Sequence, residues 1–424
     1  MLSHISLNNK QNIQSHENIQ SYENIQSYEN NKEDDTKKDN TSNNTNTQDL
    51  ENTNEKKDFK YTIKNTNDEE YQYIYLLKQI LVNGNKEKSR NGNTFSLFGR
   101  SMRFSLKDNK IPILTTKKIA WKTCLKELLW FVSGETDNLI LQNQDVHIWD
   151  HNSSRDYLDS ICLFNYSENE LGPIYGHQWR NFNGVYIPKE YQEYTFFILI
   201  KRYVEYLKSL NDFERVLQKQ FSIYFFIFFF MTFIFLNNVY VSFFVIVISS
   251  GIFCSNKIFK ILSDDGVDQL QDVINVLKNP ETRHSRRIVM SSWNPCQLNE
   301  MALPPCHILC QFNVHDNNKL SCAVYQRSGD VGLGVPFNIA SYGFLTHLIA
   351  KHCNLEASEL ILFLGNCHIY EEHVKALQEQ IDRKMYDFPT LQIKNVYENI
   401  NDYKYTDFLI ENYQHNDEIK MVLR

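Results

Sequence analysis

The sequence predicts an α+β fold, because it contains clear strand-like and helix-like stretches. Apolar residues alternate with polar or small ones in Ile308–Val314 and again in Leu320–Val324, which is the period of half-buried strands. Apolar residues recur at helical spacing in Asp68–Val82 and from Pro336 to about His352. The chain of 424 residues is long enough for one large domain or two.

Composition narrows the class of protein. The net charge is −7, which does not favour bulk nucleic-acid binding, and the nine cysteines form no CxxC pair. Scattered cysteines favour a reducing, cytoplasmic compartment over a zinc site or a disulfide framework, so we expect no metal. The segment Met1–Lys10 is too polar to be the apolar core of a signal peptide.

The N-terminal stretch is a low-complexity extension. Ile13–Asn18 repeats with small changes as Ile19–Asn24 and Ile25–Asn30, and polar residues dominate throughout. Too little apolar surface exists there to offset the entropy lost on ordering. We therefore expect residues 1–67 to be disordered.

A second helix is expected from Lys117 to Ser133. Thr115 and Thr116 can cap its start, and Gly134 can close its end. Glu127 lies on the largely apolar face of this helix. A glutamate in that position is either a poorly placed surface residue or a buried carboxylate with a function.

The two predicted strands form a β-hairpin, since His315–Asn318 between them is a turn cluster. A turn centred there pairs residues whose numbers sum to about 634. Cys306 then lies beside Ser328, and His307 lies beside Arg327. A permanently charged arginine favours a thiolate nucleophile, although a small buried apolar cysteine is the alternative.

A later strand is expected at Ile361–Leu364, ended by Gly365–Tyr370. His368 and Tyr370 alternate on one side of this extended segment, so both can donate to one hydroxyl group of a ligand. A structural histidine is the alternative.

Several of these stretches resemble the active-site segments of thymidylate synthase. The resemblance covers residues 68–194 and 263–424, the two parts of one expected domain. Its most specific segments are Pro304–His307, Gln326–Asp330, Gly334–Tyr342, Lys126–Phe131 and Gly172–Arg180.

The resemblance implies both a fold and a reaction. The implied fold has one large mixed β-sheet with helices on one face, while the other face packs against a second copy in a homodimer. The implied enzyme is a methyltransferase that converts dUMP to dTMP through a covalent adduct on Cys306. Its co-substrate would be 5,10-methylenetetrahydrofolate, which yields dihydrofolate, and neither a metal nor nucleic acid would be needed.

The resemblance also implies a set of site residues. The implied catalytic residues are Cys306, Glu127, Tyr175, His307, Asn338 and Arg327. The implied dUMP-binding residues are Arg90, Arg286, Arg287, Gln326, Arg327, Ser328, Asp330, Asn338, His368 and Tyr370. The implied folate-binding residues are Ile148, Trp149, Asn152, Asp330, Leu333, Gly334 and Phe337.

Three of the similar segments depart from the family pattern or have a plain alternative. Ser89–Gly99 is similar to the family's phosphate loop but is one residue shorter, and Arg90 is otherwise a solvated loop arginine. Arg286 and Arg287 resemble the pair that crosses the dimer interface to the partner's phosphate, and are otherwise a solvated patch. Ile419–Arg424 departs from the apolar tail that closes over folate in the family.

Residues 195–262 interrupt the resemblance. Ile223–Leu236 is almost wholly apolar and Val239–Ile248 continues the pattern, so pattern alone predicts a membrane span. A span would separate Tyr175 from Cys306, which the chemistry excludes. Phe, Ile, Asn, Tyr and Lys are the residues that AT-rich DNA encodes without selection. We therefore expect an unspliced intron and no membrane association.

Three alternatives stay open. The insertion would suit a membrane-anchored or inactive member of the family. A deoxycytidylate hydroxymethylase is the second alternative, and Asn338 argues against it. The third concerns length: this chain is either a stand-alone synthase or the synthase part of a fusion with dihydrofolate reductase.

Overall fold

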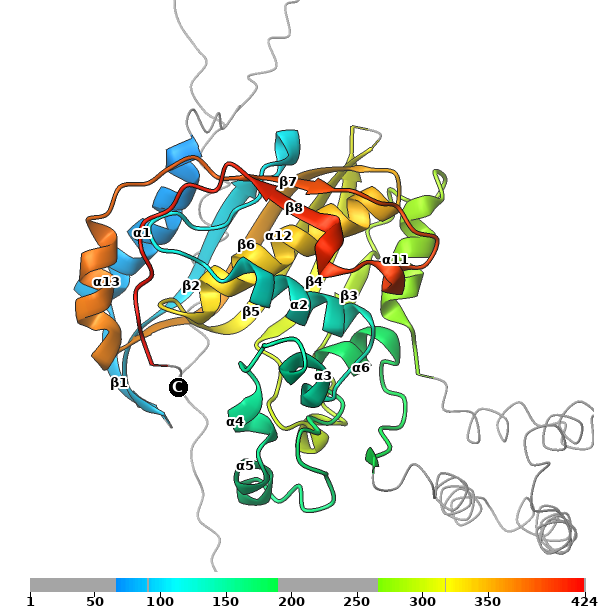
Figure 1. Ribbon diagram of the computed structural model, residues 1–424, viewed down its shortest axis with the longest axis horizontal. Coiled ribbons are helices and arrows are strands. Elements are labelled where there is room, and N and C mark those ends of the chain that lie inside the picture. Colours follow the sequence, from blue (N-terminus) through cyan, green and yellow to red (C-terminus); the bar gives the residue numbers. More distant parts are fainter. Residues whose placement is uncertain (1–65, 90, 190–265, 317, 423–424) are drawn as a thin grey trace, which may run out of the picture. The chain divides into compact units, whose positions relative to one another are not determined.

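The computed structural model describes residues 66–89, 91–189, 266–316 and 318–422 (Figure 1). Nearly all of the expected extension 1–67 and all of the insertion 195–262 lie outside the described residues. The same holds for Arg90, the expected phosphate-loop arginine. The predictions for these segments are therefore not tested by the structure.

A six-stranded sheet forms the centre of the fold, in the order β1-β2-β6-β5-β4-β3. Strands β5 and β6 run parallel, and the other neighbours run antiparallel, so the predicted mixed sheet is confirmed. The strands are β1 Asn85–Ser89, β2 Gly92–Ser105, β3 Val289–Ser291, β4 His307–His315, β5 Lys319–Asp330 and β6 Glu356–Tyr370. A separate two-stranded sheet pairs β7 Thr390–Ile393 with β8 Phe408–Glu411.

Helices complete the predicted α+β architecture. The α-helices are α1 Thr66–Asn83, α2 Trp121–Val132, α3 Asn138–Gln142, α4 Asp150–Ser153, α5 Arg155–Ser160, α6 Tyr175–Arg180, α11 Gln269–Lys278, α12 Gly334–His352 and α13 Val374–Ile381. Short 3₁₀ turns occur at Lys107–Asn109, Leu298–Glu300, Glu371–His373, Ile400–Asp402 and Tyr405–Asp407.

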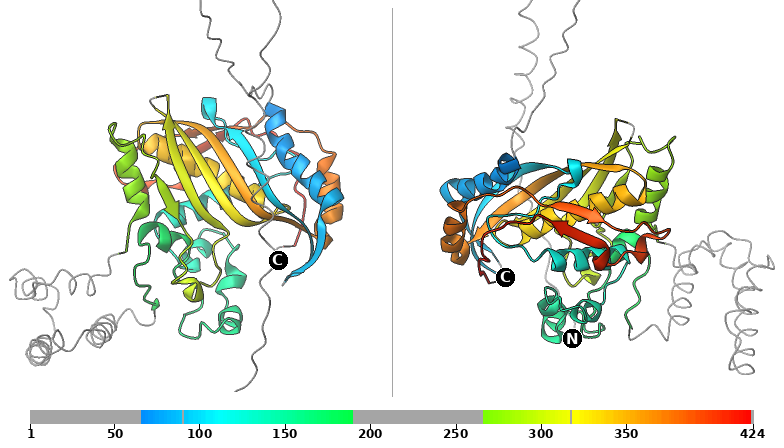
Figure 2. Two further views of the ribbon diagram at one scale, coloured as in Figure 1. Left: turned by 180° about the vertical axis from the view of Figure 1, so that it is seen from behind. Right: turned by 45° about the horizontal axis from the view of Figure 1, so that its top comes forward.

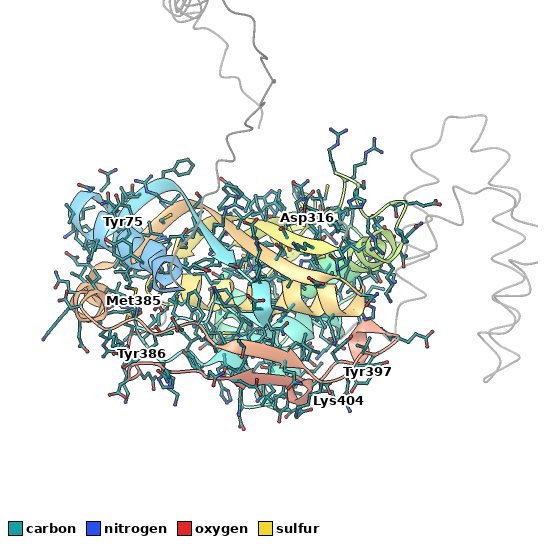
Figure 3. All side chains as sticks on the ribbon, turned by 90° about the horizontal axis from the view of Figure 1, so that it is seen from above. Tyr75, Asp316, Met385, Tyr386, Tyr397 and Lys404 are labelled. Atoms are coloured by element: carbon teal, nitrogen blue, oxygen red, sulfur yellow. The ribbon has the colours of Figure 1, made fainter. Side chains whose placement is uncertain are left out.

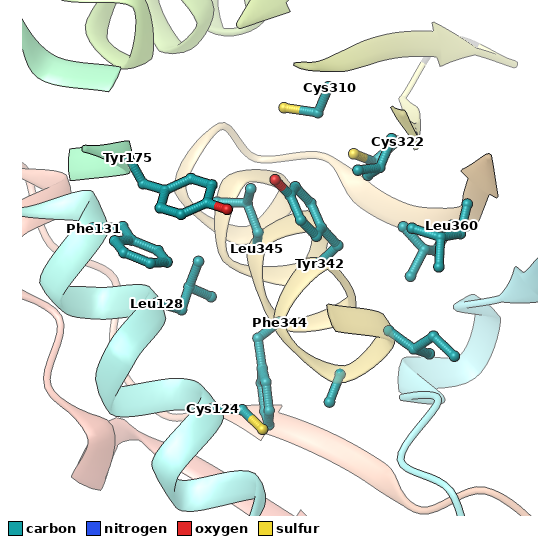
Figure 4. Packing of buried hydrophobic residues seen from close by; sticks show 14 of the residues in the cluster. Cys124, Leu128, Phe131, Tyr175, Cys310, Cys322, Tyr342, Phe344, Leu345 and Leu360 are labelled. Atoms are coloured by element: carbon teal, nitrogen blue, oxygen red, sulfur yellow. The ribbon is translucent and has the colours of Figure 1, made fainter. Parts of the chain in front are cut away.

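Helix α12 is the buried centre of a layered arrangement. It packs against β5 and β6 on one side and against α2 on another. Figure 3 shows the six-stranded sheet, α12 and the β7–β8 pair as successive layers. Ring contacts of Phe344 with Phe408 and of His352 with Tyr403 join α12 to the outer layer. In Figure 4, Phe344 of α12 lies beside Cys124 of α2, and Leu345 lies on the side of Leu128 and Phe131.

The opposite face of the sheet is open to view in Figure 2, left. Its strands place large apolar side chains outward, in alternation with buried ones. Those exposed by more than a third of their surface are Phe98, Val289, Leu309, Tyr325 and Phe363. The face that the sequence resemblance assigns to a second copy therefore carries several large apolar side chains beside exposed polar ones such as Gln311 and Asn313.

The β4–β5 hairpin forms as predicted over most of its length. Pairs from His315–Lys319 to Leu309–Tyr325 follow the predicted register, but a bulge at Ile308 then shifts it by one residue. His307 consequently pairs with Gln326, and the carbonyl of Cys306 accepts a bond from Arg327 N. The prediction that His307 lies beside Arg327 and Cys306 beside Ser328 is thus wrong by one position.

The expected cap of α2 is also wrong. The helix begins at Trp121, and Ala120 precedes it without a side-chain cap. Thr115 and Thr116 instead donate to the buried carboxylate of Glu70, with bonds from both backbone amides and from the Thr115 hydroxyl at 2.6–3.1 Å. The end of α2 is as predicted, because Gly134 has a φ of 80° that suits glycine after a helix.

Candidate active site

Cys306 lies one residue before β4, where the bulge begins. Its backbone N–H donates to the Tyr175 hydroxyl at 2.7 Å, so residues 131 positions apart in sequence meet here. Cys306 is partly exposed, whereas Cys310 and Cys322 of the same hairpin are 1% and 0% exposed. Cys306 is therefore the hairpin cysteine that a ligand can reach.

Arg327 is fixed beside Cys306 by Pro304 and Pro305, the two residues that precede Cys306. Its Nε donates to the carbonyl of Pro305 at 2.8 Å, and its Nη2 donates to that of Pro304 at 3.0 Å. The guanidinium also lies 5.5 Å from the ring centre of Trp293. Burial raises the pKa of the Cys306 thiol, and the charge of Arg327 opposes that rise.

A chain of hydrogen bonds orients the polar groups behind Cys306. Gln326 Nε2 donates both to the Ser328 carbonyl and to Asn338 Oδ1, each at 2.9 Å, and Asn338 Nδ2 meets His307 Nε2 at 2.7 Å. The Ser328 carbonyl can only accept, so the group of Gln326 that faces it must be the NH2 group. The same NH2 group then donates to Asn338 Oδ1, which leaves the NH2 group of Asn338 facing His307. His307 Nε2 must then be the acceptor.

His307 is a neutral base in this arrangement. Burial lowers its pKa to about 4, and a neutral ring is what acceptance of the Asn338 N–H at Nε2 requires. Its ring lies 5.1 Å from that of Tyr175 and 5.4 Å from that of Tyr342. The bulge turns His307 to the inner face of the sheet, which brings it among these groups. Figure 4 shows the hydroxyl groups of Tyr175 and Tyr342 pointing into the same region.

Glu127 is the buried carboxyl of the site. Burial raises its pKa to about 7, and a bond from Trp149 Nε1 at 2.7 Å acts in the opposite direction. Trp149 also lies 6.4 Å from the ring of Tyr175. A carboxyl group with a pKa near neutrality can hold or release a proton during a reaction.

A cavity of about 360 Å³ lies beside the hairpin. Four of the predicted nucleotide-binding residues, Arg327, Ser328, His368 and Tyr370, line it. The other lining residues, which the sequence analysis missed, are Glu87, Ser89, Asn91, Thr94 and Asn366. Ser89 and Asn91 flank Arg90 in the sequence. Their place beside the predicted phosphate-loop arginine was the signal that could have identified them as cavity residues.

His368 is held within this cavity. Its Nδ1 lies 2.9 Å from Asn366 Oδ1, and its ring is perpendicular to that of Tyr370 at 5.5 Å. Burial lowers the pKa of His368, while the charges of Asp330 and Glu87 act to raise it. The residue therefore has a defined orientation toward the cavity.

The predicted folate-binding residues occupy two segments. Asp330 ends β5, and Leu333, Gly334 and Phe337 follow it at the start of α12, each of them half-buried. Ile148, Trp149 and Asn152 lie before and within α4. Trp149 joins the second segment to the catalytic cluster through its bond to Glu127.

Arg286 and Arg287 are not brought to Cys306 within one chain. Both side chains are exposed and precede β3, which is the last strand of the sheet order. The bonds that fix them involve the backbone: the Arg286 carbonyl accepts from Gln311, and Arg287 N donates to Ser285. The prediction that they serve a partner's site stays a prediction.

The C-terminal segment approaches the Asp330 loop. Asn416 bonds to the carbonyls of Thr115 and Lys384, and the Val422 carbonyl lies 2.9 Å from His373 Nε2. A methyl group added at Gly332 would lie 3.5 Å from His373 Nδ1.

The described residues contain neither a candidate membrane-spanning helix nor a candidate metal-binding cluster. Outside residues 1–65 and 190–265, no helix is both long enough and apolar enough to cross a membrane. Within the same residues, no three His, Cys, Asp or Glu side chains are grouped so that they could hold a metal ion.

Comparison with known proteins gives a consistent result. The sequence model of the family described as thymidylate synthase matches residues 71–424. The bifunctional dihydrofolate reductase-thymidylate synthase of Plasmodium berghei (strain Anka) is 40% identical over 361 residues, covering 85% of this chain and 49% of that protein. The protein of the same name from Leishmania major is 39% identical, covering 84% of this chain and 55% of its own length. The chain thus spans about half the length of these relatives.

Proposed function

This chain belongs to the thymidylate synthase family, and on that premise we propose that it methylates dUMP to dTMP. The co-substrate is 5,10-methylenetetrahydrofolate, which leaves as dihydrofolate. The observation that carries the proposal is the reachable Cys306 beside Arg327, backed by Tyr175, His307, Asn338 and Glu127. The printed names of the relatives also include a reductase, and we propose only the synthase activity for this chain.

The chemistry follows from the weakness of uracil as a nucleophile. Position five of the ring does not attack a carbon donor unaided. Addition of the Cys306 thiolate to position six forms an S–C bond and moves an electron pair toward position five and the carbonyl at position four. When bound, methylenetetrahydrofolate supplies both the one-carbon unit and the hydride. Loss of the proton at position five breaks the bond between the transferred carbon and the folate nitrogen. Hydride addition to that carbon then forms the methyl group, restores the double bond between positions five and six, and breaks the S–C bond, which releases Cys306.

The surrounding groups match the charges that develop. Glu127 and Asn338 stabilise the oxygen at position four, where negative charge builds up. Tyr175 and neutral His307 handle the proton lost from position five. Arg327 and Ser328 contact the phosphate, while His368 and Tyr370 contact the sugar from the same cavity.

Asn338 selects uracil over cytosine in this proposal. The hydrogen-bond chain leaves Asn338 Oδ1 with a second lone pair and Nδ2 with a second N–H. These can accept from the ring N–H of uracil and donate to its carbonyl at position four. Cytosine offers an amino group and a bare nitrogen instead, which leaves both pairs mismatched.

We propose further that the enzyme is a homodimer in the cytoplasm. The outer sheet face exposes Phe98 by 77% and Phe363 by 44%, which supports its burial against a second copy. Arg286 and Arg287 would then reach the phosphate in the partner's site. All eight cysteines in the described residues are free thiols, which supports a reducing compartment.

The test is turnover with dUMP and 5,10-methylenetetrahydrofolate, monitored by the formation of dihydrofolate, both for the full chain and for a chain that joins residues 193–195 to Ser263. Cys306→Ser should abolish turnover and keep dUMP binding, because the phosphate contacts are unchanged. Mass spectrometry after incubation with fluorodeoxyuridylate and the folate should place the adduct on Cys306. An adduct on any other cysteine, or turnover by Cys306→Ser, would contradict the assignment.

A further inference from the structure

The loop Asp330–Leu333 connects β5 to α12 and carries two of the folate-binding residues that the resemblance implies, Asp330 and Leu333. Val331 N donates to the His368 carbonyl at 2.8 Å. Asp330 Oδ1 accepts from Gly332 N at 2.8 Å and from Leu333 N at 3.3 Å. Within the described part of the chain, Asp330 Oδ2 has no hydrogen bond, so one carboxylate oxygen holds the loop and the other is free for a ligand.

Two buried side chains from outside the active site bind the carbonyls of this loop. Tyr73 of α1 is 0% exposed, and its hydroxyl donates to the Val331 carbonyl at 2.9 Å. Lys117 is 4% exposed, and its ammonium group donates to the Gly332 carbonyl. Consecutive carbonyls of the loop are therefore each bound by a side chain from a different segment.

A lysine in this position needs a reason, because burying an ammonium group is costly. Burial lowers the pKa of Lys117 to about 8, although the nearby charge of Asp330 acts to raise it. The Gly332 carbonyl is its acceptor in the described residues. Since a methyl group at Gly332 would lie 3.2 Å from Asp330 Oδ1 and 3.4 Å from Leu377, the loop is also enclosed on its other side.

We propose that Tyr73 and Lys117 clamp the Asp330–Leu333 loop, and that they thereby present the free oxygen of Asp330 to the pterin ring of the folate. Both are positioning residues that act through Asp330. The proposal rests on the proposed function, since it assumes that folate is the ligand at Asp330. Without the clamp, the Val331 and Gly332 carbonyls would be buried acceptors without donors, and the loop would have to shift.

Binding of tetrahydrofolate in the presence of dUMP tests the clamp, because this folate has the pterin ring but no carbon to transfer. Calorimetry on the full chain gives the Kd for each ligand. Tyr73→Phe and Lys117→Met should each raise the Kd for tetrahydrofolate by about tenfold, the loss expected for one hydrogen bond of about 1.4 kcal/mol. The Kd for dUMP should rise less than the Kd for tetrahydrofolate, because Arg327, Ser328 and Tyr370 still line the nucleotide cavity, and a folded chain is shown by this retained dUMP binding.

Matched variants separate the clamp from a general effect on structure. Tyr75→Phe and Lys118→Met change exposed neighbours of the same type and should bind as the wild type does. Lys117→Gln keeps an N–H donor for the Gly332 carbonyl and should restore most of the affinity that Lys117→Met loses. In an Asp330→Asn background, Tyr73→Phe should cause little further loss, because its effect passes through Asp330.

Two outcomes would overturn the clamp. The first is wild-type affinity for tetrahydrofolate in Tyr73→Phe and Lys117→Met. The second is the same loss whether or not Asp330 is intact. Failure of the wild-type chain to bind either dUMP or tetrahydrofolate would be a different result, since it would contradict the proposed function.

Discussion

The indole N–H of Trp149 donates to Glu127 at 2.7 Å, which joins the proposed folate platform to the catalytic carboxyl group. The bond favours the ionised carboxylate, whereas burial favours the protonated acid and has the larger effect. The pKa of about 7 is therefore set by residues on both sides of the site.

Glu127→Gln should be more stable than the wild type at high pH. The unfolded chain releases the Glu127 proton near pH 4.5, but the folded chain keeps it until about pH 7, so wild-type stability falls between these values. Each unit of pKa difference is worth about 1.36 kcal/mol, which gives Glu127→Gln an advantage of up to about 3 kcal/mol at pH 8. Urea unfolding at pH 4 and pH 8 measures the difference in the free energy of unfolding between Glu127→Gln and the wild type. The same difference at both pH values would contradict the raised pKa of Glu127.

Arg327→Gln should make the Cys306 thiol less reactive. The guanidinium opposes the rise in the pKa of Cys306 that burial causes, so its loss raises that pKa further. Alkylation by iodoacetamide requires the thiolate, and below the pKa its rate falls about tenfold for each unit of pKa. Peptide mass spectrometry measures the rate at Cys306, with exposed Cys162 as the internal control. If Arg327→Gln leaves the ratio of the alkylation rates at Cys306 and Cys162 unchanged, the charge of Arg327 does not affect the Cys306 thiol.

Asn338→Asp should weaken the preference for dUMP over dCMP. A carboxylate has no N–H for the uracil carbonyl, and it would also place an acceptor against His307 Nε2 unless one of the two takes a proton. The ratio of kcat/KM for the two nucleotides should fall by at least about tenfold, as expected for mismatched buried polar groups. A ratio equal to that of the wild type would show that Asn338 does not select the base.

Mixing two inactive variants should restore activity if subunits share sites. Arg287 is exposed beside the edge strand β3, which β4 separates from β5, the strand that carries Arg327. Heterodimers of Cys306→Ser and Arg287→Glu would contain one site with both native residues. Turnover of the mixture is compared with that of each variant alone, after subunit exchange is verified with a mass tag. Exchange without recovery would count against a shared site.

The working protein should lack most of residues 195–262. Tyr175 precedes this segment and Cys306 follows it, yet the two are joined by a 2.7 Å bond, so a single membrane span between them is incompatible with the site. Phe182 and Val267 exchange backbone hydrogen bonds at 2.8 and 3.0 Å, which closes the loop at its base. A shortened chain that joins residues 193–195 to Ser263 should therefore be folded and active.

Messenger RNA sequencing across these codons is the direct measurement. Most of codons 195–262 should be absent from the mature transcript. Detection of the apolar peptide by mass spectrometry in the native, active protein would refute the prediction. An inactive shortened chain beside an active full chain would also contradict it.

The sequence patterns correctly predicted the β4–β5 hairpin and helix α1, which depend on the spacing of neighbouring apolar residues. Alternation in Ile308–Val314 and Leu320–Val324 gave the hairpin, and its register is as predicted from Leu309–Tyr325 to His315–Lys319, because one face of each strand is buried. The helical spacing in Asp68–Val82 gave α1 within two residues at its start and one at its end. Patterns also singled out Cys306, Glu127, His368 and Tyr370 as candidates, whereas their roles and the remaining site residues came from the resemblance.

Features that depend on distant contacts were missed. Thr115 and Thr116 have the sequence of a helix cap, but Glu70 binds them from a helix 45 residues earlier. Glu87 and Ser89 line the cavity from an exposed polar strand that has no distinguishing pattern. No local signal marks Ile308 as an extra residue in its strand, because Cys306 and His307 fit either register equally well.

The bulge at Ile308 has a consequence for how the length of this hairpin can change. Its carbonyl accepts bonds from Ser292 and Trp293, so the extra residue is fixed in place. Loss of the codon for Ile308 would leave His307 opposite Gln326 and on the same face, but it would remove the carbonyl that holds Ser292 and Trp293, whose ring lies against Arg327. A codon gained in the turn after Asp316 would only lengthen the loop. Variation in length should therefore persist at the tip of this hairpin and be eliminated by selection at its base, even though both ends belong to the same two strands.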